Sequence, residues 1–110
     1  MKPPDPKLKK LVALKRQSAE QALLSVQQEA NRLEEAIEGL NARLRDADDS
    51  TLDFEAIRLS RQEHFVEAML GRIKALRAER EALNPRLEAA RDALRKAIYS
   101  EGQLDRLASG

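Results

Sequence analysis

An apolar stripe with a repeat of about 3.5 residues runs through both halves of this sequence and constrains the fold more than any other feature. In the first half the steps alternate between four and three residues, and only Arg16 is polar. The members are Val12, Arg16, Ala19, Leu23, Val26, Ala30, Leu33, Ile37, Leu40, Leu44 and Ala47. This spacing is typical of the contact seam of a coiled coil.

The second half carries the same alternation, and eleven of its fourteen seam positions are apolar. The members are Leu59, Gln62, Val66, Met69, Ile73, Leu76, Arg80, Leu83, Leu87, Ala90, Leu94, Ala97, Glu101 and Leu104. Because only a short acidic segment joins the two seams, we expect them to pack against each other. The sequence predicts an all-α protein, a long antiparallel two-helix coiled-coil hairpin whose second helix is the longer one.

The predicted helix boundaries follow from capping residues. Residues 1–5 form an N-terminal arm, and Asp5 followed by Pro6 is typical of a helix start, so helix 1 is expected over about 6–46. The turn is expected at 47–50, where Ser50 and Asp53 have the spacing of a capping box. Helix 2 is then expected over about 51–107, followed by a tail at 108–110.

Pro85 lies inside the expected second helix, where proline costs roughly 3 kcal/mol. It indicates either a kink or the start of a third helix capped by Asn84. Because the seam continues through this stretch without a change of spacing, the sequence favours a kink.

A turn at 47–50 pairs residues whose numbers add up to about 97. Arg16 and Arg80 would then lie at one level of the hairpin, either fixing the register or facing a partner. Helix 2 beyond about residue 90 would have no helix facing it. Its apolar seam residues would need an external partner.

The residue inventory favours an interaction protein over an enzyme. The chain has no Cys and a single histidine, His64, which falls on the outward face of helix 2. The acidic run that begins at Asp46 lacks the Gly and Glu spacing of a calcium loop, since Thr51 and Ile57 occupy those positions. We therefore expect no catalytic residue, no metal and no cofactor.

The charges give no general attraction to nucleic acid, because the net charge is only +1 and aromatic residues make up 3% of the chain. Residues 1–16 are basic and the central break is acidic. No apolar run approaches the length of a membrane span, so we expect no integral membrane segment. A soluble, cytoplasmic protein is predicted.

The basic arm, the start of helix 1 from Lys10 to Gln17, the short acidic tip and the return helix rich in Arg, Glu, Leu and Ala together resemble the FliJ/YscO family over residues 7–107. The resemblance implies a non-enzymatic coiled-coil stalk of the flagellar or virulence type III protein export apparatus. It implies binding to the hexameric export ATPase and to the export gate, as a monomer in the complex. It also implies a cytoplasmic location peripheral to the inner-membrane export apparatus.

The expected overhang of helix 2 would then be the part associated with the ATPase. The predicted partner-binding residues are Arg91, Leu94, Arg95, Ile98, Tyr99, Leu104 and Arg106. A second contact is expected at the tip, at Asp48, Asp49 and Phe54. Two other interpretations stay open: a cytoplasmic export chaperone or adaptor that holds a client helix on the open seam, and a homodimeric structural coiled coil.

Overall fold

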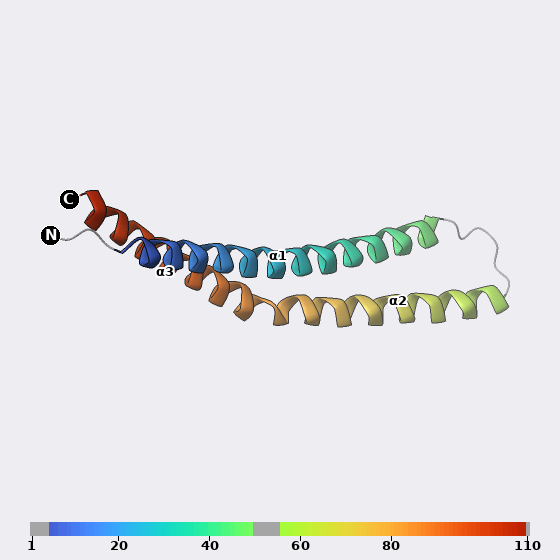
Figure 1. Ribbon diagram of the computed structural model, residues 1–110. Helices are drawn as coiled ribbons and strands as arrows, with labels where there is room; N and C mark the ends of the chain where they lie inside the picture. The colour runs from blue at the N-terminus through green and yellow to red at the C-terminus, as the bar shows by residue number, and fades with distance from the viewer. Residues whose placement is uncertain (1–4, 50–55, 110) are drawn as a thin grey trace. The chain divides into compact units, whose positions relative to one another are not determined.

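Three helices make up the computed structural model (Figure 1), which describes the backbone of residues 5–49 and 56–109 and the side chains of residues 5–46 and 61–108. They are α1 (Pro6–Asp49), α2 (Ala56–Ala82) and α3 (Asn84–Ser109). The described residues contain no β-strand. The predicted all-α class is therefore confirmed.

The chain divides into two compact units, which are considered separately. In the terminal unit (residues 1–28 and 84–110) α1 pairs with α3, and in the central unit (residues 29–83) α1 pairs with α2. Within each unit the two helices run antiparallel (Figure 1). The predicted antiparallel helical hairpin is thus confirmed unit by unit.

The start of α1 is capped as the sequence predicts. The backbone N–H of Lys7 donates to Oδ1 of Asp5 at 3.0 Å, and the N–H of Leu8 donates to the Asp5 carbonyl oxygen at 2.9 Å. Pro6 is the first helical residue, where the missing N–H leaves no bond unmade. At its other end α1 continues to Asp49, so residues 47–49 of the expected turn are helical. Ser50 and Asp53 lie outside the described residues.

The return half of the chain differs from the single helix expected over 51–107. Leu83 is a turn residue between α2 and α3, and Pro85 is the second residue of α3. The N–H of Leu83 donates to the Arg80 carbonyl oxygen at 3.2 Å, and Pro85 has no N–H with which to continue the helical bonding. The structure therefore has the third helix that begins at Asn84 in place of a kinked continuous one.

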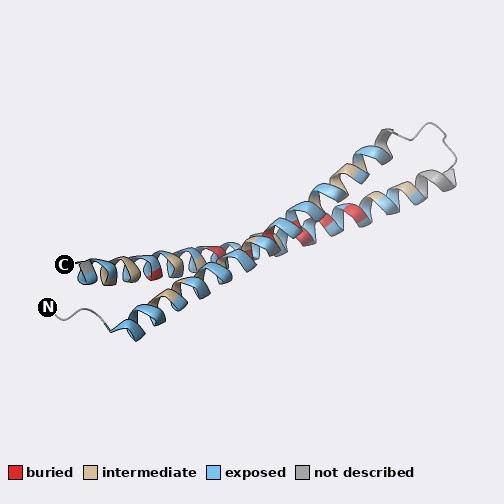
Figure 2. Cartoon of the chain, turned by 45° about the horizontal axis from the view of Figure 1, so that its top comes forward, coloured by how far each residue is buried: buried red, intermediate tan, exposed pale blue. Residues whose placement is uncertain are grey.

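The core follows the two predicted seams, and every seam member whose side chain is described is buried or half-buried (Figure 2). The most buried residues are Val26, Ala30, Leu33, Met69, Ile73, Leu76, Leu83, Leu87 and Ala97. Leu83 and Leu87 are both 5% exposed, so the apolar spacing is maintained on each side of the break between α2 and α3. Burial of such side chains stabilises each helix pair by roughly 1.5–3 kcal/mol per large residue.

The expected register is wrong. Arg16 forms an ion pair with Glu101 in the terminal unit, and Arg80 forms one with Glu34 in the central unit. The residue numbers 16 and 101 add up to 117, and 34 and 80 add up to 114, where about 97 was expected. α1 runs on to Asp49 and α2 begins only at Ala56, so the connection is centred later than 47–50 and the numbers of facing residues add up to more than 97. In this register each arginine faces a carboxylate.

This register also removes the expected overhang of the return helix. Ala97 is only 5% exposed and Leu104 is half-buried, so α1 covers α3 into its last turns. In the central unit, by contrast, the first turns of α2 lie beyond the end of α1 (Figure 1). The backbone of α2 thus extends past the end of α1, whereas α3 is covered at least as far as Leu104.

Candidate protein-binding surfaces

The predicted partner-binding residues of α3 divide into two groups. Leu94 and Leu104 are half-buried seam residues that pack toward α1. Ile98 is 52% exposed and Tyr99 is 67% exposed. Three arginines of the predicted set are exposed as well: Arg91, Arg95 and Arg106. The five exposed residues define the α3 surface.

Helical spacing arranges the α3 surface in two adjacent strips. Arg91, Arg95 and Ile98 follow each other at steps of four and three, and Tyr99 precedes Arg106 by seven residues. The Tyr99 hydroxyl accepts a hydrogen bond from Nε2 of Gln103 at 2.6 Å, which orients the ring. Tyrosine and arginine side chains are among those that contribute most to protein interfaces, and Ile98 adds exposed apolar area beside them.

The ion pair between Arg16 and Glu101 fixes this end of α3 against α1. The Arg16 side chain is 28% exposed and that of Glu101 29% exposed, and Arg16 also pairs with Glu20 at 2.6 Å. Hydrogen bonds to Glu20 first and to Glu101 second raise the pKa of the Arg16 guanidinium. Because a raised pKa favours the charged form, the contribution to stability is lost only as the pH rises through that raised value. Arg16 is therefore charged throughout the neutral range.

Two leucines on the outer side of α1 were not among the predicted binding residues. Leu11 is 64% exposed and Leu14 is 53% exposed. Lys7, Leu11, Leu14 and Ser18 follow each other at steps of four, three and four residues and share one side of the helix, with Lys15 beside them. These five residues define the α1 outer face. The signal in the sequence was a pair of leucines three positions apart that both fall outside the seam.

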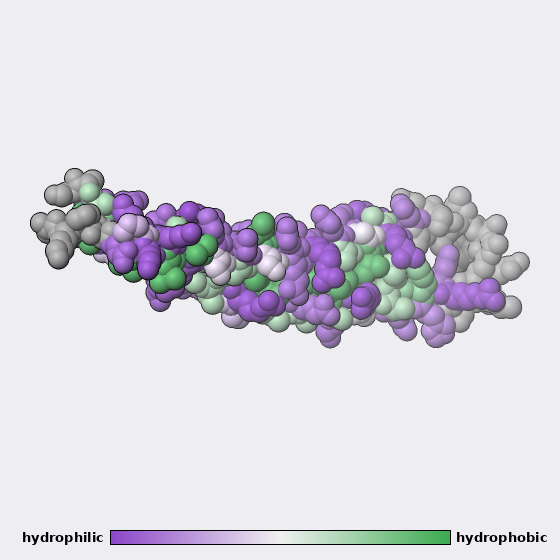
Figure 3. Space-filling model, viewed as in Figure 1, coloured by the Kyte–Doolittle hydropathy of each residue, from purple (hydrophilic) through white to green (hydrophobic). Residues whose placement is uncertain are grey.

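A cleft of about 410 Å³ opens at the start of α2 in the central unit. Its lining includes Gln62, Glu63, Val66 and Glu67, and Leu70 follows one turn further along at 53% exposure. The cleft lies where α1 ends, since the register of this unit places Val66 opposite the last turn of α1. Figure 3 shows hydrophobic side chains gathered between α1 and α2 of this unit, with hydrophilic ones around them. These lining residues and Leu70 define the α2 cleft.

A smaller cleft of about 280 Å³ lies between α1 and α3 in the terminal unit. Lys9, Lys10 and Ala13 line it from α1, and Glu101, Leu104 and Asp105 line it from α3. Charges of both signs face each other across it. The cleft therefore offers no single sign of charge to a ligand.

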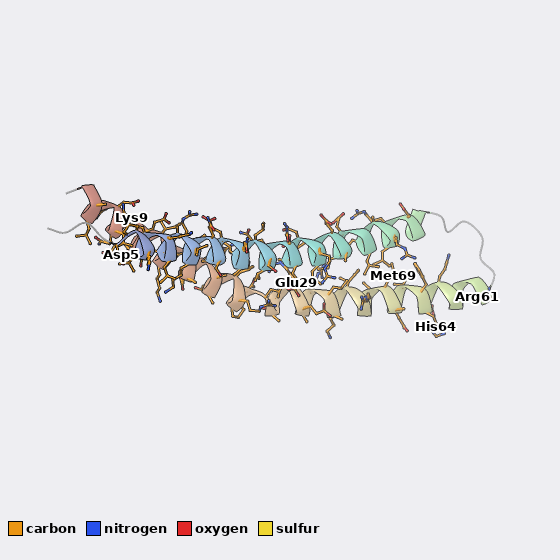
Figure 4. The ribbon with its side chains drawn as sticks, in the orientation of Figure 1. Asp5, Lys9, Glu29, Arg61, His64 and Met69 are labelled. Carbon is orange, nitrogen blue, oxygen red and sulfur yellow. The ribbon has the colours of Figure 1, made fainter. Side chains whose placement is uncertain are left out.

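His64 and the tip residues are the other positions that the sequence analysis singled out. His64 is exposed and points away from α1 (Figure 4), while Met69 on the same helix points toward α1 and is buried. Of the expected tip contact, Asp48 and Asp49 fall in the last turn of α1, where side chains are not described, and Phe54 lies outside the described residues. Among the described residues no three His, Cys, Asp or Glu side chains converge as metal ligands.

Comparison with known proteins assigns no family to this chain. None of the helices, as far as the structure describes them, combines the length and the apolar character needed to cross a bilayer. Searches against protein-family models, curated proteins and solved structures found no match to the chain.

Proposed function

We propose that this chain is a non-enzymatic coupling stalk of a type III protein export apparatus, with the flagellar apparatus as the leading case. It binds the hexameric export ATPase and the export gate as a single copy in the complex. It acts in the cytoplasm, peripheral to the inner-membrane export apparatus. The proposal starts from the resemblance of residues 7–107 to the FliJ/YscO family.

The observation that best supports the proposal is the α3 surface. Ile98 and Tyr99 expose more than half of their area on α3, outside the seam on which Leu87 and Ala97 are buried. Arg91 and Arg106 flank them and supply positive charge for an acidic partner. Truncating an aromatic or arginine anchor at an interface centre commonly costs more than about 1 kcal/mol of binding free energy.

Capture of a purified hexameric export ATPase on the immobilised full chain tests this function. Ile98→Ala combined with Tyr99→Ala should reduce capture by about tenfold or more, because both anchors are lost. Leu24→Ala on α1 is the control, since Leu24 is as exposed as Ile98 at 52% but lies outside the α3 surface. Circular dichroism should show unchanged helicity for both variants. No capture of the ATPase by the unaltered chain would contradict the proposed function.

The tip is the second contact proposed, with the export gate or the ATPase. Asp48→Asn combined with Asp49→Asn removes two carboxylates from the last turn of α1 and tests it in the same capture assay. If the tip variant loses ATPase capture and the α3 variant retains it, the ATPase contact lies at the tip. If both variants retain it, neither surface is the ATPase contact.

A further inference from the structure

We propose that a second copy of this chain docks through two surfaces of opposite charge: the α1 outer face of one copy enters the α2 cleft of the other. This goes beyond the proposed function, because it concerns the free chain and uses residues outside the α3 surface. The carrying observations are two exposed apolar surfaces, one basic and one acidic, that belong to different units of the same chain.

The charge of the chain is divided between its two units. Residues 1–28 and 84–110 contain eleven Lys and Arg and six Asp and Glu, a net charge of +5. Residues 29–83 contain nine Lys and Arg and thirteen Asp and Glu, a net charge of −4. These two values account for the net charge of +1. Two copies therefore attract each other when opposite units meet and repel when like units meet.

The α1 outer face is apolar and basic. Leu11 and Leu14 are more than half exposed on the side of α1 turned away from the seam. The ammonium groups of Lys7 and Lys15 beside them form no ion pair with any residue that the structure describes. Covering two exposed leucines removes apolar surface from water and so stabilises a contact. This face therefore suits an apolar surface bordered by carboxylates.

The α2 cleft has that composition. Val66 is half-buried within it, and Leu70 continues its apolar side with 53% exposure. Glu63 and Glu67 lie one helical turn apart at its rim, and neither carboxylate pairs with a residue in the described part of the chain. Its described lining comes from α2 alone. A helix that brings leucines to Val66 and Leu70 would bring its lysines to these glutamates.

The partner that fits is a second copy of the chain, because each copy carries both surfaces, which attract each other, while two surfaces of the same kind repel. Two α1 outer faces would bring Lys7 and Lys15 of both copies together, and two α2 clefts would bring four carboxylates together. Each copy carries both surfaces, so the same contact forms a pair or a longer series according to whether it closes.

The test is sedimentation velocity of the full chain over a concentration series at low and at high salt. We expect self-association at low salt that weakens at high salt, because exposed charges are screened. The face variant, Lys7→Glu with Lys15→Glu, and the cleft variant, Glu63→Lys with Glu67→Lys, should each weaken self-association by at least about tenfold. The control variant, Glu79→Lys with Glu81→Lys, changes the same charges on α2 away from the cleft and should weaken it much less.

Rescue of the reversed charges makes the test specific. An equimolar mixture of the face and cleft variants should associate again, because the cleft of one then meets the face of the other with opposite charge. A single chain that carries all four reversals should also self-associate. A monomeric unaltered chain at low salt, or association of the face variant equal to that of the unaltered chain, would overturn the proposal. So would a mixture that stays monomeric.

Discussion

Arg16 in α1 and Glu101 in α3 form an ion pair across the terminal unit, although 85 positions separate them in the chain. Both are polar members of otherwise apolar seams, and both side chains are about seven-tenths covered. Their pairing shows that the Arg16 level of α1 lies opposite the Glu101 level of α3.

Reversing one charge of this pair should destabilise the terminal unit, and reversing both should restore it. Glu101→Arg places a second guanidinium beside Arg16 and should lower the thermal midpoint. Arg16→Glu combined with Glu101→Arg should recover most of the loss. The same cycle at Arg95 and Asp92, an exposed pair at 3.0 Å, serves as the control and should show little coupling. Additive effects at Arg16 and Glu101 would mean that the pair does not fix the register.

The register itself can be measured with spin labels, because the chain has no native cysteine. Labels at Ala13→Cys and Gly102→Cys should lie side by side, since both positions belong to the level of the Arg16 and Glu101 pair. Labels at Ala13→Cys and Asn84→Cys should be farther apart by roughly 27 Å, the length of 18 helical residues. The expectation from a turn at 47–50 is the reverse. A short distance between positions 13 and 84 would therefore contradict the structure.

The heptad pattern predicted the contact surfaces of the helices, because burial of apolar side chains requires one continuous stripe on each helix. Gln62 and Arg80 are predicted seam members that are polar, and both are half-buried as the pattern requires. Asp5 and Pro6 likewise predicted the first turn of α1, because capping depends only on neighbouring residues. Features that arise from local chemistry or from periodicity could therefore be predicted from the sequence.

Apolar spacing alone could not predict the register, because a heptad seam looks the same after each repeat. The polar seam members carried the missing information. Arg16 in the first seam is opposite in charge to Glu101 in the second seam, whereas Arg80 in the second seam has the same charge as Arg16. The α3 surface was predicted from an overhang that does not exist, and only its exposed residues remain candidates. The α2 cleft was missed for the same reason, since it depends on where α1 ends.

Ile73→Ala should lower the free energy of unfolding by about 2–5 kcal/mol, because Ile73 is 3% exposed and its removal leaves a cavity in the central unit. Leu70→Ala on the same helix should change it by less than about 0.5 kcal/mol, since Leu70 is 53% exposed. Chemical denaturation followed by circular dichroism measures both values. Equal losses for the two variants would mean that the seam assigned to α2 faces the wrong way.

Gly39→Ala and Gly71→Ala should each stabilise the chain by about 0.5–1 kcal/mol. Both glycines lie inside helices, are exposed and have no atom within 4 Å of the position that an added Cβ would take. Alanine loses less backbone entropy than glycine on entering a helix, so the gain needs no new contact. The same denaturation measurement checks it, and the two gains should add because α1 and α2 carry one substitution each. A loss of stability at Gly39 would show that a partner copy or another helix approaches this side of α1 closely.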